Sequence, residues 1–354
     1  MVFSRYDGIR IAGIAAAVPE REINMESLKE TEDPQMIENF IKKTGIKKIH
    51  KGYPNQTAGD YAYTAAVALK EAGKYMAEEI GVLIDVTQNP DYRTPSTASA
   101  LHMRLGLDKS CLVFDVNLGC SGFVYGVSLA ASLLTTSNAK KALVLVGDSL
   151  AREGRTEIAR KSNTALLFGD ASTAILLEKA EGGVINSALM SDGTGYKALI
   201  TPFGAWRHPH GPSSIPGDDI AVFNFTISEV PALLKEFMQT TESTIDDYDA
   251  LVLHQANMMI MKQIAKKVKM PMEKVPVSLD QFGNTSGASV PLTIVKTYGE
   301  QNEGKKLKLL TSGYGIGLSW GVVSFEINDS DILPLKISRD LFEDGYPDDL
   351  PDDD

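Results

Sequence analysis

The sequence is poor in cysteine: Cys111 and Cys120 are the only two in 354 residues. So few cysteines exclude a disulfide framework and are typical of a reducing, cytoplasmic protein, in which a thiol stays free for chemistry. The chain also lacks an apolar run of the roughly 20 residues that span a bilayer, and its first residues lack the basic and apolar regions of a secretory leader. A net charge of −11 argues against nucleic acid as a partner. We therefore expect a soluble cytoplasmic protein.

Cys120 lies between Gly119 and Gly122, at the point where a predicted strand ends and a predicted helix begins. Residues 113–116 form a short apolar run, and residues 121–134 are small and apolar on all sides, as in a buried helix. The first turn of a helix has unpaired N–H groups and the positive end of the dipole, both of which favour a thiolate. On this stretch alone an inert buried cysteine remains the simpler interpretation.

Strand and helix patterns alternate along the chain. Strands are expected at 10–17, 80–86 and 140–148, and helices at 25–43, 60–72 and 97–105. Seven acidic residues and two prolines lie between 343 and 354. Such a composition cannot bury enough apolar surface to order itself, so residues 328–354 are predicted to form an acidic, partly disordered extension.

The order of patterns repeats in the second half of the chain. Residues 249–257 resemble 81–89, residues 275–287 take the place of the Cys120 stretch, and residues 305–312 echo 140–147, all at an offset of about 165 to 168 residues. Alternating strands and helices imply parallel sheets covered on both faces. The sequence thus predicts an internally duplicated α/β protein with five layers, α/β/α/β/α, made of halves 1–180 and 181–327.

Cys120, His254 and Asn284 each follow a predicted strand or its counterpart in the repeat. Because ligands of α/β sheets bind beyond the carboxyl ends of strands, we expect the three side chains to converge where the halves meet. A cysteine, a histidine and an amide donor form a set suited to nucleophilic catalysis, with donors for a developing negative charge.

Four stretches also resemble the signature motifs of β-ketoacyl-acyl-carrier-protein synthase III, a family of thiolase-fold condensing enzymes. The similarity runs to about residue 327 in the family's order, and shorter landmarks at 44–46 and 168–171 agree with it. The four stretches are Gly119-Cys120-Ser121-Gly122, His254-Gln255-Ala256-Asn257, Gly283-Asn284-Thr285-Ser286 and residues 315–321.

The resemblance implies a role for each motif. Cys120 would take an acyl group from a thioester, with its own N–H and that of Gly317 forming the oxyanion hole. His254 and Asn284 would bind the carbonyl of a malonyl donor, so that loss of CO2 leaves an enolate they stabilise. It also implies an acyltransferase without a bound cofactor or metal, acting as a homodimer. Its substrates would be an acyl-CoA or acyl-carrier protein together with a malonyl-carrier protein.

Three positions depart from the family pattern. Asn39 and Lys43 stand where members primed by coenzyme A have a tryptophan and an arginine, and Met259 stands where a carrier-docking arginine is usual. Lysine keeps the charge but lacks the bidentate fork of arginine. We therefore expect a carrier-bound or unusual acyl primer. Basic residues that could replace the docking arginine are Lys262, Lys266 and Lys267.

Other features leave room for different interpretations. In the family, the loop that holds Thr94 reaches the partner's acyl pocket. The run from His208 to His210 has two histidines but no further ligand pattern, so a metal site is not expected there. Two other functions stay open: acyl transfer to an oxygen or nitrogen acceptor, and a non-catalytic partner subunit. The intact Cys120, His254 and Asn284 argue against the last.

Overall fold

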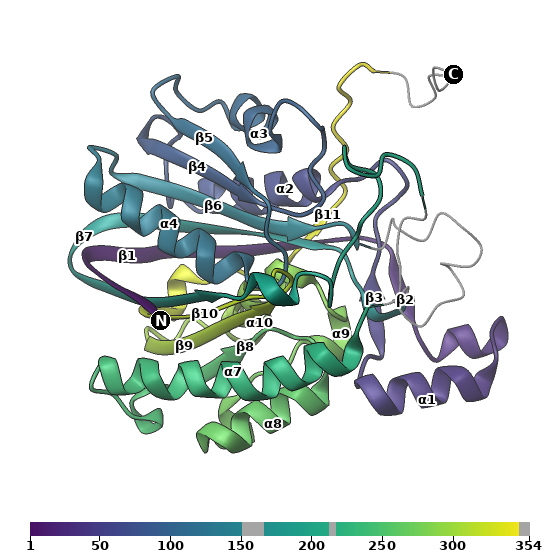
Figure 1. Cartoon of the computed structure of the whole chain (residues 1–354). Coiled ribbons are helices and arrows are strands. Elements are labelled where there is room, and N and C mark those ends of the chain that lie inside the picture. The colour runs from purple at the N-terminus through teal and green to yellow at the C-terminus, as the bar shows by residue number, and fades with distance from the viewer. Residues whose placement is uncertain (151–165, 212–216, 347–354) are drawn as a thin grey trace.

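The computed structural model describes residues 1–150, 166–211 and 217–346 of the chain. Helices cover a β-structure on both sides and also fill its middle (Figure 1). The strands are β1 (Val2–Pro19), β2 (Glu22–Asn24), β3 (Lys48–His50), β4 (Ile80–Val86), β5 (Leu112–Val116), β6 (Lys141–Asp148), β7 (Ala171–Ser191), β8 (Ala250–Leu253), β9 (Lys306–Gly315), β10 (Ser319–Asn328) and β11 (Lys336–Ser338). The helices are α1 (Pro34–Thr44), α2 (Ala58–Glu71), α3 (Thr97–Leu105), α4 (Gly122–Thr136), α7 (Asp219–Thr240), α8 (Met258–Val268), α9 (Leu279–Phe282) and α10 (Ser289–Tyr298).

The internal duplication is visible in the strand pairing. In the N-terminal half β4 runs parallel to β6, with Val82 opposite Ala142, and β6 runs antiparallel to β7. In the C-terminal half β8 runs parallel to β9, with Ala250 opposite Leu309, and β9 runs antiparallel to β10. The two long strands β1 and β7 pair along nearly their whole length and pass through both halves. The main sheet therefore has the order β5-β4-β6-β7-β10-β9-β8, with β1 beside β7.

Figure 1 shows the layers stacked from α2 and α3 at the top to α7 and α8 at the bottom. One apolar core surrounds the middle helices, and one further core lies under each outer helix layer. The middle core holds α4 and α10 between the halves, with side chains such as Phe123 and Val323. Strand β4 is buried on both faces, because Ile84 joins the middle core and Leu83 the outer one. The five-layered thiolase arrangement expected from the sequence is confirmed.

Two expectations about local structure were wrong. The helix expected at 25–43 is interrupted: a short 3-10 turn covers Ser27–Glu30, and α1 begins only at Pro34, with Asp33 capping it by accepting a hydrogen bond from the N–H of Gln35. Proline is favoured at a helix start because it has no N–H to leave unpaired. The first strand is also much longer than residues 10–17, because β1 serves both halves.

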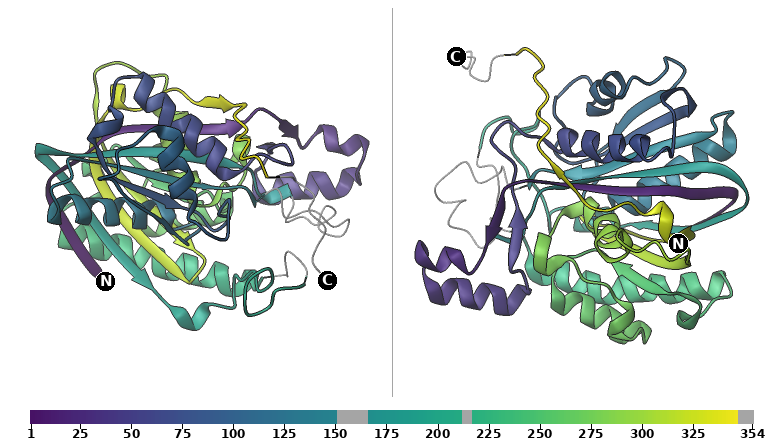
Figure 2. Two further views of the ribbon diagram at one scale, coloured as in Figure 1. Left: turned by 90° about the horizontal axis from the view of Figure 1, so that it is seen from above. Right: turned by 180° about the vertical axis from the view of Figure 1, so that it is seen from behind.

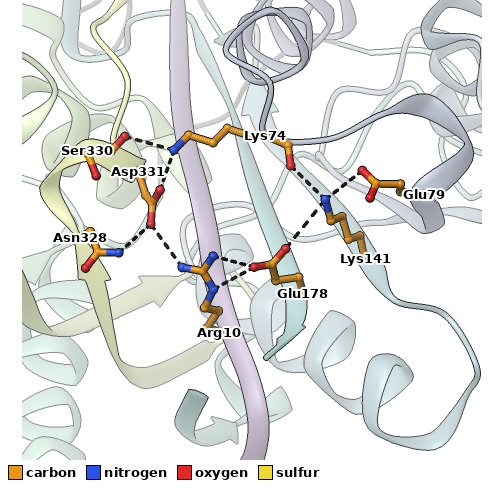
Figure 3. Close-up of polar contacts among 8 residues, drawn as sticks. All are labelled: Arg10, Lys74, Glu79, Lys141, Glu178, Asn328, Ser330 and Asp331. Atoms are coloured by element: carbon orange, nitrogen blue, oxygen red, sulfur yellow. Dashed lines mark hydrogen bonds and ion pairs between the residues drawn. The ribbon is translucent and has the colours of Figure 1, made fainter. Parts of the chain in front are cut away.

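The segment after β10 packs on the body instead of extending from it. Ile332 is buried in the middle core, and β11 runs parallel to the end of β1 (Figure 2). A network of charges ties this segment to the two long strands (Figure 3): Arg10 bridges Glu178 at 2.6 Å and Asp331 at 3.3 Å. The remaining members of the network are Lys74, Glu79, Lys141, Asn328 and Ser330. The extension predicted at 328–354 is thus folded as far as residue 346, and residues 347–354 lie outside the described part.

Candidate active site

Cys120, His254 and Asn284 come from three separate elements and share one neighbour, Ser286. Cys120 precedes α4, His254 follows β8, and Asn284 follows α9. The Oγ atom of Ser286 lies 3.9 Å from the Sγ atom of Cys120, and the N–H of Ser286 donates to Oδ1 of Asn284 at 2.9 Å. A backbone hydrogen bond also links Ser286 to His254. The three predicted residues therefore lie around Ser286.

The chain packs closely around Cys120, which is 8% exposed. A Cβ atom added to Gly315 would lie 2.7 Å from the Cβ and 3.0 Å from the Sγ atom of Cys120. A Cβ on Gly119 would lie 2.9 Å from the side chain of Gln88. Gly315 is needed because its backbone lies within contact distance of the nucleophile, whereas a side chain at position 119 would displace the amide of Gln88.

Burial, and not the helix start, dominates the ionisation of Cys120. Removal from water raises the pKa of the thiol to about 11, and the nearby charge of Asp148 acts in the same direction. The Ser286 hydroxyl and the backbone N–H groups of Cys120 and Ile316 lower it, but by less. The net shift in the pKa of the Cys120 thiol is thus upward, opposite to the effect expected of the helix start alone.

The same contacts identify the backbone N–H groups that lie against the sulfur. The backbone groups that approach the sulfur are those of Cys120 and Ile316, whereas the sequence pointed to Gly317. Ile316 is one residue nearer than Gly317 to the end of β9. The last residue of β9, Gly315, lies directly against Cys120.

His254 is held as a neutral imidazole. Burial lowers the pKa of His254 to about 3. Its Nδ1 atom lies 2.7 Å from the hydroxyl of Ser289, which also accepts a hydrogen bond from the N–H of Gln255. When Ser289 donates its hydrogen to Nδ1, the ring hydrogen lies on Nε2. The Tyr314 ring packs edge-on against the imidazole, with 5.3 Å between the two ring centres, and the Tyr314 hydroxyl donates to the His254 carbonyl.

Asn284 is fixed at both its backbone and its side chain. Its N–H donates to the carbonyl of Leu167, and its carbonyl accepts from the N–H of Gly169. Because the N–H of Ser286 occupies Oδ1, the NH2 group of Asn284 is the part left to meet a ligand. Asn284 therefore presents its NH2 group as a hydrogen-bond donor.

Comparison with known proteins finds similar chains and structures. Family models described as 3-oxoacyl-[acyl-carrier-protein] synthase III and its C-terminal part match residues 114–193 and 238–327. The β-ketoacyl-[acyl-carrier-protein] synthase III of Xanthomonas euvesicatoria pv. vesicatoria is 33% identical over 323 residues, covering 88% of this chain and 96% of the relative. The corresponding protein of Ehrlichia canis is 34% identical over 322 residues, covering 88% and 97%.

This chain belongs to the β-ketoacyl-acyl-carrier-protein synthase III family, which comprises acyltransferases. Among solved structures, 3-oxoacyl-(acyl-carrier protein) synthase from Burkholderia xenovorans matches with a TM-score of 0.90 at 32% identity, covering 95% of this chain and 99% of that one. The priming β-ketosynthase of the R1128 polyketide pathway matches with a TM-score of 0.80 at 25% identity, covering 93% and 97%.

The residues that depart from the family pattern lie on exposed surfaces of two neighbouring helices. Asn39 and Lys43 are exposed on α1, and Met259 is 54% exposed in the first turn of α8. Helices α1 and α8 contact each other. The α8 lysines Lys262, Lys266 and Lys267 are exposed as well.

Thr94 lies apart from these helices, on the exposed loop between β4 and α3. Its neighbour Arg93 places its guanidinium 5.3 Å from the ring of Trp206. Residues 212–216, which follow Trp206 in the chain, lie outside the described part. Within that part no three metal-ligating side chains gather, and no helix is long and apolar enough to cross a membrane.

Four residues in contact with this site were not singled out from the sequence: Ser286, Gln88, Asp148 and Tyr314. Ser286 belongs to a family motif, and Gln88 lies in the stretch that matches 249–257 in the duplication, so each had a signal. Asp148 at the end of β6 had none beyond its place at a strand end.

Proposed function

We propose that the protein condenses an acyl thioester with a malonyl-carrier-protein thioester, holding the acyl group on Cys120 between the two steps. In the first step the sulfur of Cys120 bonds to the acyl carbon and the donor leaves as a thiol. In the second, the malonyl carboxylate leaves as CO2, and the resulting enolate carbon attacks the acyl carbon and releases Cys120 as a thiolate, which takes up a proton from water. The products are a 3-ketoacyl thioester, CO2 and the free enzyme.

The pair of donors on His254 and Asn284 carries this proposal. The NH2 group of Asn284 is left to meet a ligand, and beside it His254 is a neutral imidazole whose ring contacts Ser289 and the backbone of Ser286. Loss of CO2 requires no strong base, only donors aimed at the oxygen on which negative charge develops. Each such donor is typically worth about 3 to 4 kcal/mol of barrier. A neutral histidine suits this task, because it donates without adding a buried charge.

For acyl transfer, we propose that the N–H groups of Cys120 and Ile316 bind the oxyanion, in place of the Cys120 and Gly317 pair expected from the sequence. The supporting observation is that both groups lower the pKa of the Cys120 thiol, so both lie against the reacting sulfur. Backbone donors held by a helix start and a strand end need no reorganisation during the reaction.

We further propose an acyl carrier protein as partner, docked on α8 beside the end of α1. Carrier proteins are acidic, and this face offers Lys262, Lys266 and Lys43. Lys267 contributes less, because its Nζ atom donates to the carbonyl of Ile227 at 2.8 Å. A carrier-bound primer fits the exposed Asn39, which offers no stacking surface for a nucleotide base.

Two copies of the chain would pair through β5, the end strand of the main sheet, whose Leu112 is 49% exposed. In such a dimer Thr94 would help to shape the partner's acyl pocket. The free thiols of Cys111 and Cys120 fit a cytoplasmic protein.

The function is tested by mixing the enzyme with acyl thioester and malonyl-carrier protein labelled in the free carboxyl group. We expect labelled CO2 and a 3-ketoacyl-carrier product, both absent with Cys120→Ala. His254→Ala and Asn284→Ala should still accept the acyl group but release CO2 at least 10²-fold more slowly. If the acyl group leaves Cys120 only when an alcohol or amine is supplied, and no CO2 is released, the protein is instead an acyltransferase for oxygen or nitrogen acceptors.

A further inference from the structure

A chain of hydrogen bonds runs from the nucleophile to a buried carboxylate. Beyond the 3.9 Å contact between Cys120 and Ser286, the side-chain NH2 of Gln88 donates to the Ser286 hydroxyl at 3.0 Å and to Oδ2 of Asp148 at 3.2 Å. The Ser286 hydroxyl also hydrogen-bonds the Asp148 carboxylate, which helps to lower the pKa of Asp148. Asp148 is 1% exposed at the end of β6. None of the steps proposed above uses it.

The direction of the hydrogen bonds in this chain follows from its end groups. An ionised carboxylate only accepts and an amide NH2 only donates, so the Ser286 oxygen accepts from Gln88 and directs its own hydrogen to Asp148. A hydroxyl has two lone pairs, and the second is left for the thiol hydrogen of Cys120. Cys120 therefore donates to Ser286, and Ser286 donates to the carboxylate of Asp148.

The backbone holds Ser286 in this position at a conformational cost. Its φ is +51°, in the left-handed region that a serine rarely adopts. The bond from its N–H to Asn284 fixes the residue there. Strain of this kind persists where the surrounding structure imposes it, which is common at functional sites.

The alternative proton acceptor, His254, is less suitable. Its pKa is lowered to about 3, and its Nδ1 atom is already engaged by Ser289. Burial raises the pKa of Asp148 to about 6, against hydrogen bonds from Ser286, Gln88 and Thr87 that lower it. A group that titrates near the working pH is the better base.

Charge balance favours the same acceptor. If the Cys120 proton left for water, a thiolate and a carboxylate would share one buried site, and the charge of Asp148 already raises the pKa of the thiol. Moving the proton to Asp148 keeps the pair at a single negative charge. Among the described titratable groups, Asp148 raises the pKa of the neighbouring Asp85 on β4, as do Asp115 and Asp91.

We propose that Asp148 is the proton acceptor for Cys120 during acyl transfer and acts through the hydroxyl of Ser286. As the sulfur bonds to the acyl carbon, the S–H bond breaks and its proton passes to the Ser286 oxygen. The Ser286 hydroxyl proton passes to the carboxylate. When the donor's carbon–sulfur bond breaks, the proton returns by the same path to the departing thiolate. This inference rests on the proposed formation of acyl-Cys120.

The test is the single-turnover rate of acyl-Cys120 formation, measured by intact mass at a series of pH values. For the wild type we expect the rate to fall below an inflection near pH 6, where Asp148 becomes protonated. Asp148→Asn should acylate about 10²- to 10³-fold more slowly at pH 7.5. Its rate should rise steadily with pH and show no inflection near 6.

Two further variants keep the test decisive. Ser286→Gly tolerates the positive φ, breaks the path and leaves the carboxylate in place, so it should also lose the inflection. Asp91→Asn is the matched control, because Asp91 is also buried with a pKa raised to about 6 but bonds Thr57 and Gly59 and not Ser286. It should keep the wild-type rate and profile.

Different results would contradict the proposed function and the role of Asp148. Absence of an acyl adduct on the wild type at every pH would contradict the proposed function. Normal acylation with an unchanged inflection in both Asp148→Asn and Ser286→Gly would overturn only the role of Asp148. Loss of the inflection in His254→Ala, with Asp148→Asn unaffected, would assign the proton to His254.

Discussion

The hydroxyl of Ser289, 2.7 Å from Nδ1 of His254, determines which ring nitrogen carries the hydrogen. The Ser289 oxygen also accepts from the Gln255 N–H, and when Ser289 donates its own hydrogen to Nδ1 the ring donates from Nε2. The donor that the decarboxylation needs is thus fixed by a residue at the start of α10 that need not touch the substrate.

Replacing Ser289 by alanine should therefore separate the two half-reactions. Without the hydroxyl the imidazole can adopt either tautomer, so we expect Ser289→Ala to release CO2 from malonyl-carrier protein roughly tenfold more slowly, which corresponds to about 1.4 kcal/mol. Acylation of Cys120 should not change, and Ser289→Thr should restore much of the rate. Equal losses in both half-reactions would mean that Ser289 serves only to pack the site.

Ionisation of Cys120 can be measured directly. The pKa of Cys120 in the folded protein, about 11, lies above the ordinary value of 9.0, so folding favours the neutral thiol. This contribution to stability is fully present below pH 9 and is lost as pH rises through 11. In a Cys111→Ala background, we expect the ultraviolet absorbance of the thiolate to appear only above about pH 10. A thiolate already present at pH 7 would restore the helix-start explanation and remove the need for a proton acceptor.

Arg104 holds the C-terminal segment to the N-terminal half. It pairs with Asp60 and Asp340, and its guanidinium lies 4.2 Å from the ring centre of Tyr63 and 4.6 Å from that of Phe342. Arg104→Met leaves the buried Asp60 unpaired, so we expect a loss of about 3 to 5 kcal/mol in the free energy of unfolding by urea.

The matched control is Arg339→Met, because Arg339 makes its ion pair with Glu20 on the surface, where such pairs contribute little. We expect its unfolding midpoint to stay near that of the wild type. An equal and small effect of both substitutions would mean that residues 339–346 add nothing to the stability of the body.

Carrier docking on α8 predicts a change in KM without a change in chemistry. Reversing two charges in Lys262→Glu/Lys266→Glu should raise KM for malonyl-carrier protein about tenfold or more, and the effect should weaken with salt. Acylation of Cys120 by a small acyl thioester should be unaffected. The same double reversal at Lys305 and Lys306, which lie at the start of β9 and away from α8, serves as the control. An unchanged KM would place the docking surface elsewhere.

The sequence allowed the duplication and the residues Cys120, His254 and Asn284 to be predicted, because strand ends of a repeated α/β unit meet at one seam. It could not give the ionisation of Cys120, since the helix start was visible locally but the burial that outweighs it comes from distant segments such as Gly315. The link from Ser286 through Gln88 to Asp148 joins three places in the chain, and only the fold brings them together. The ion pair between Asp340 and Arg104 could not be predicted either, because the two residues are far apart in the chain.

The most direct test of the central claim is the intact mass of the protein before and after malonyl-carrier protein is added to enzyme treated with an acyl thioester. The account predicts one acyl group on the wild type and none on Cys120→Ala. On addition of malonyl-carrier protein the acyl group should disappear as an equal amount of CO2 is released. An adduct of the same size on Cys120→Ala, or no adduct on the wild type with any acyl thioester, would contradict it.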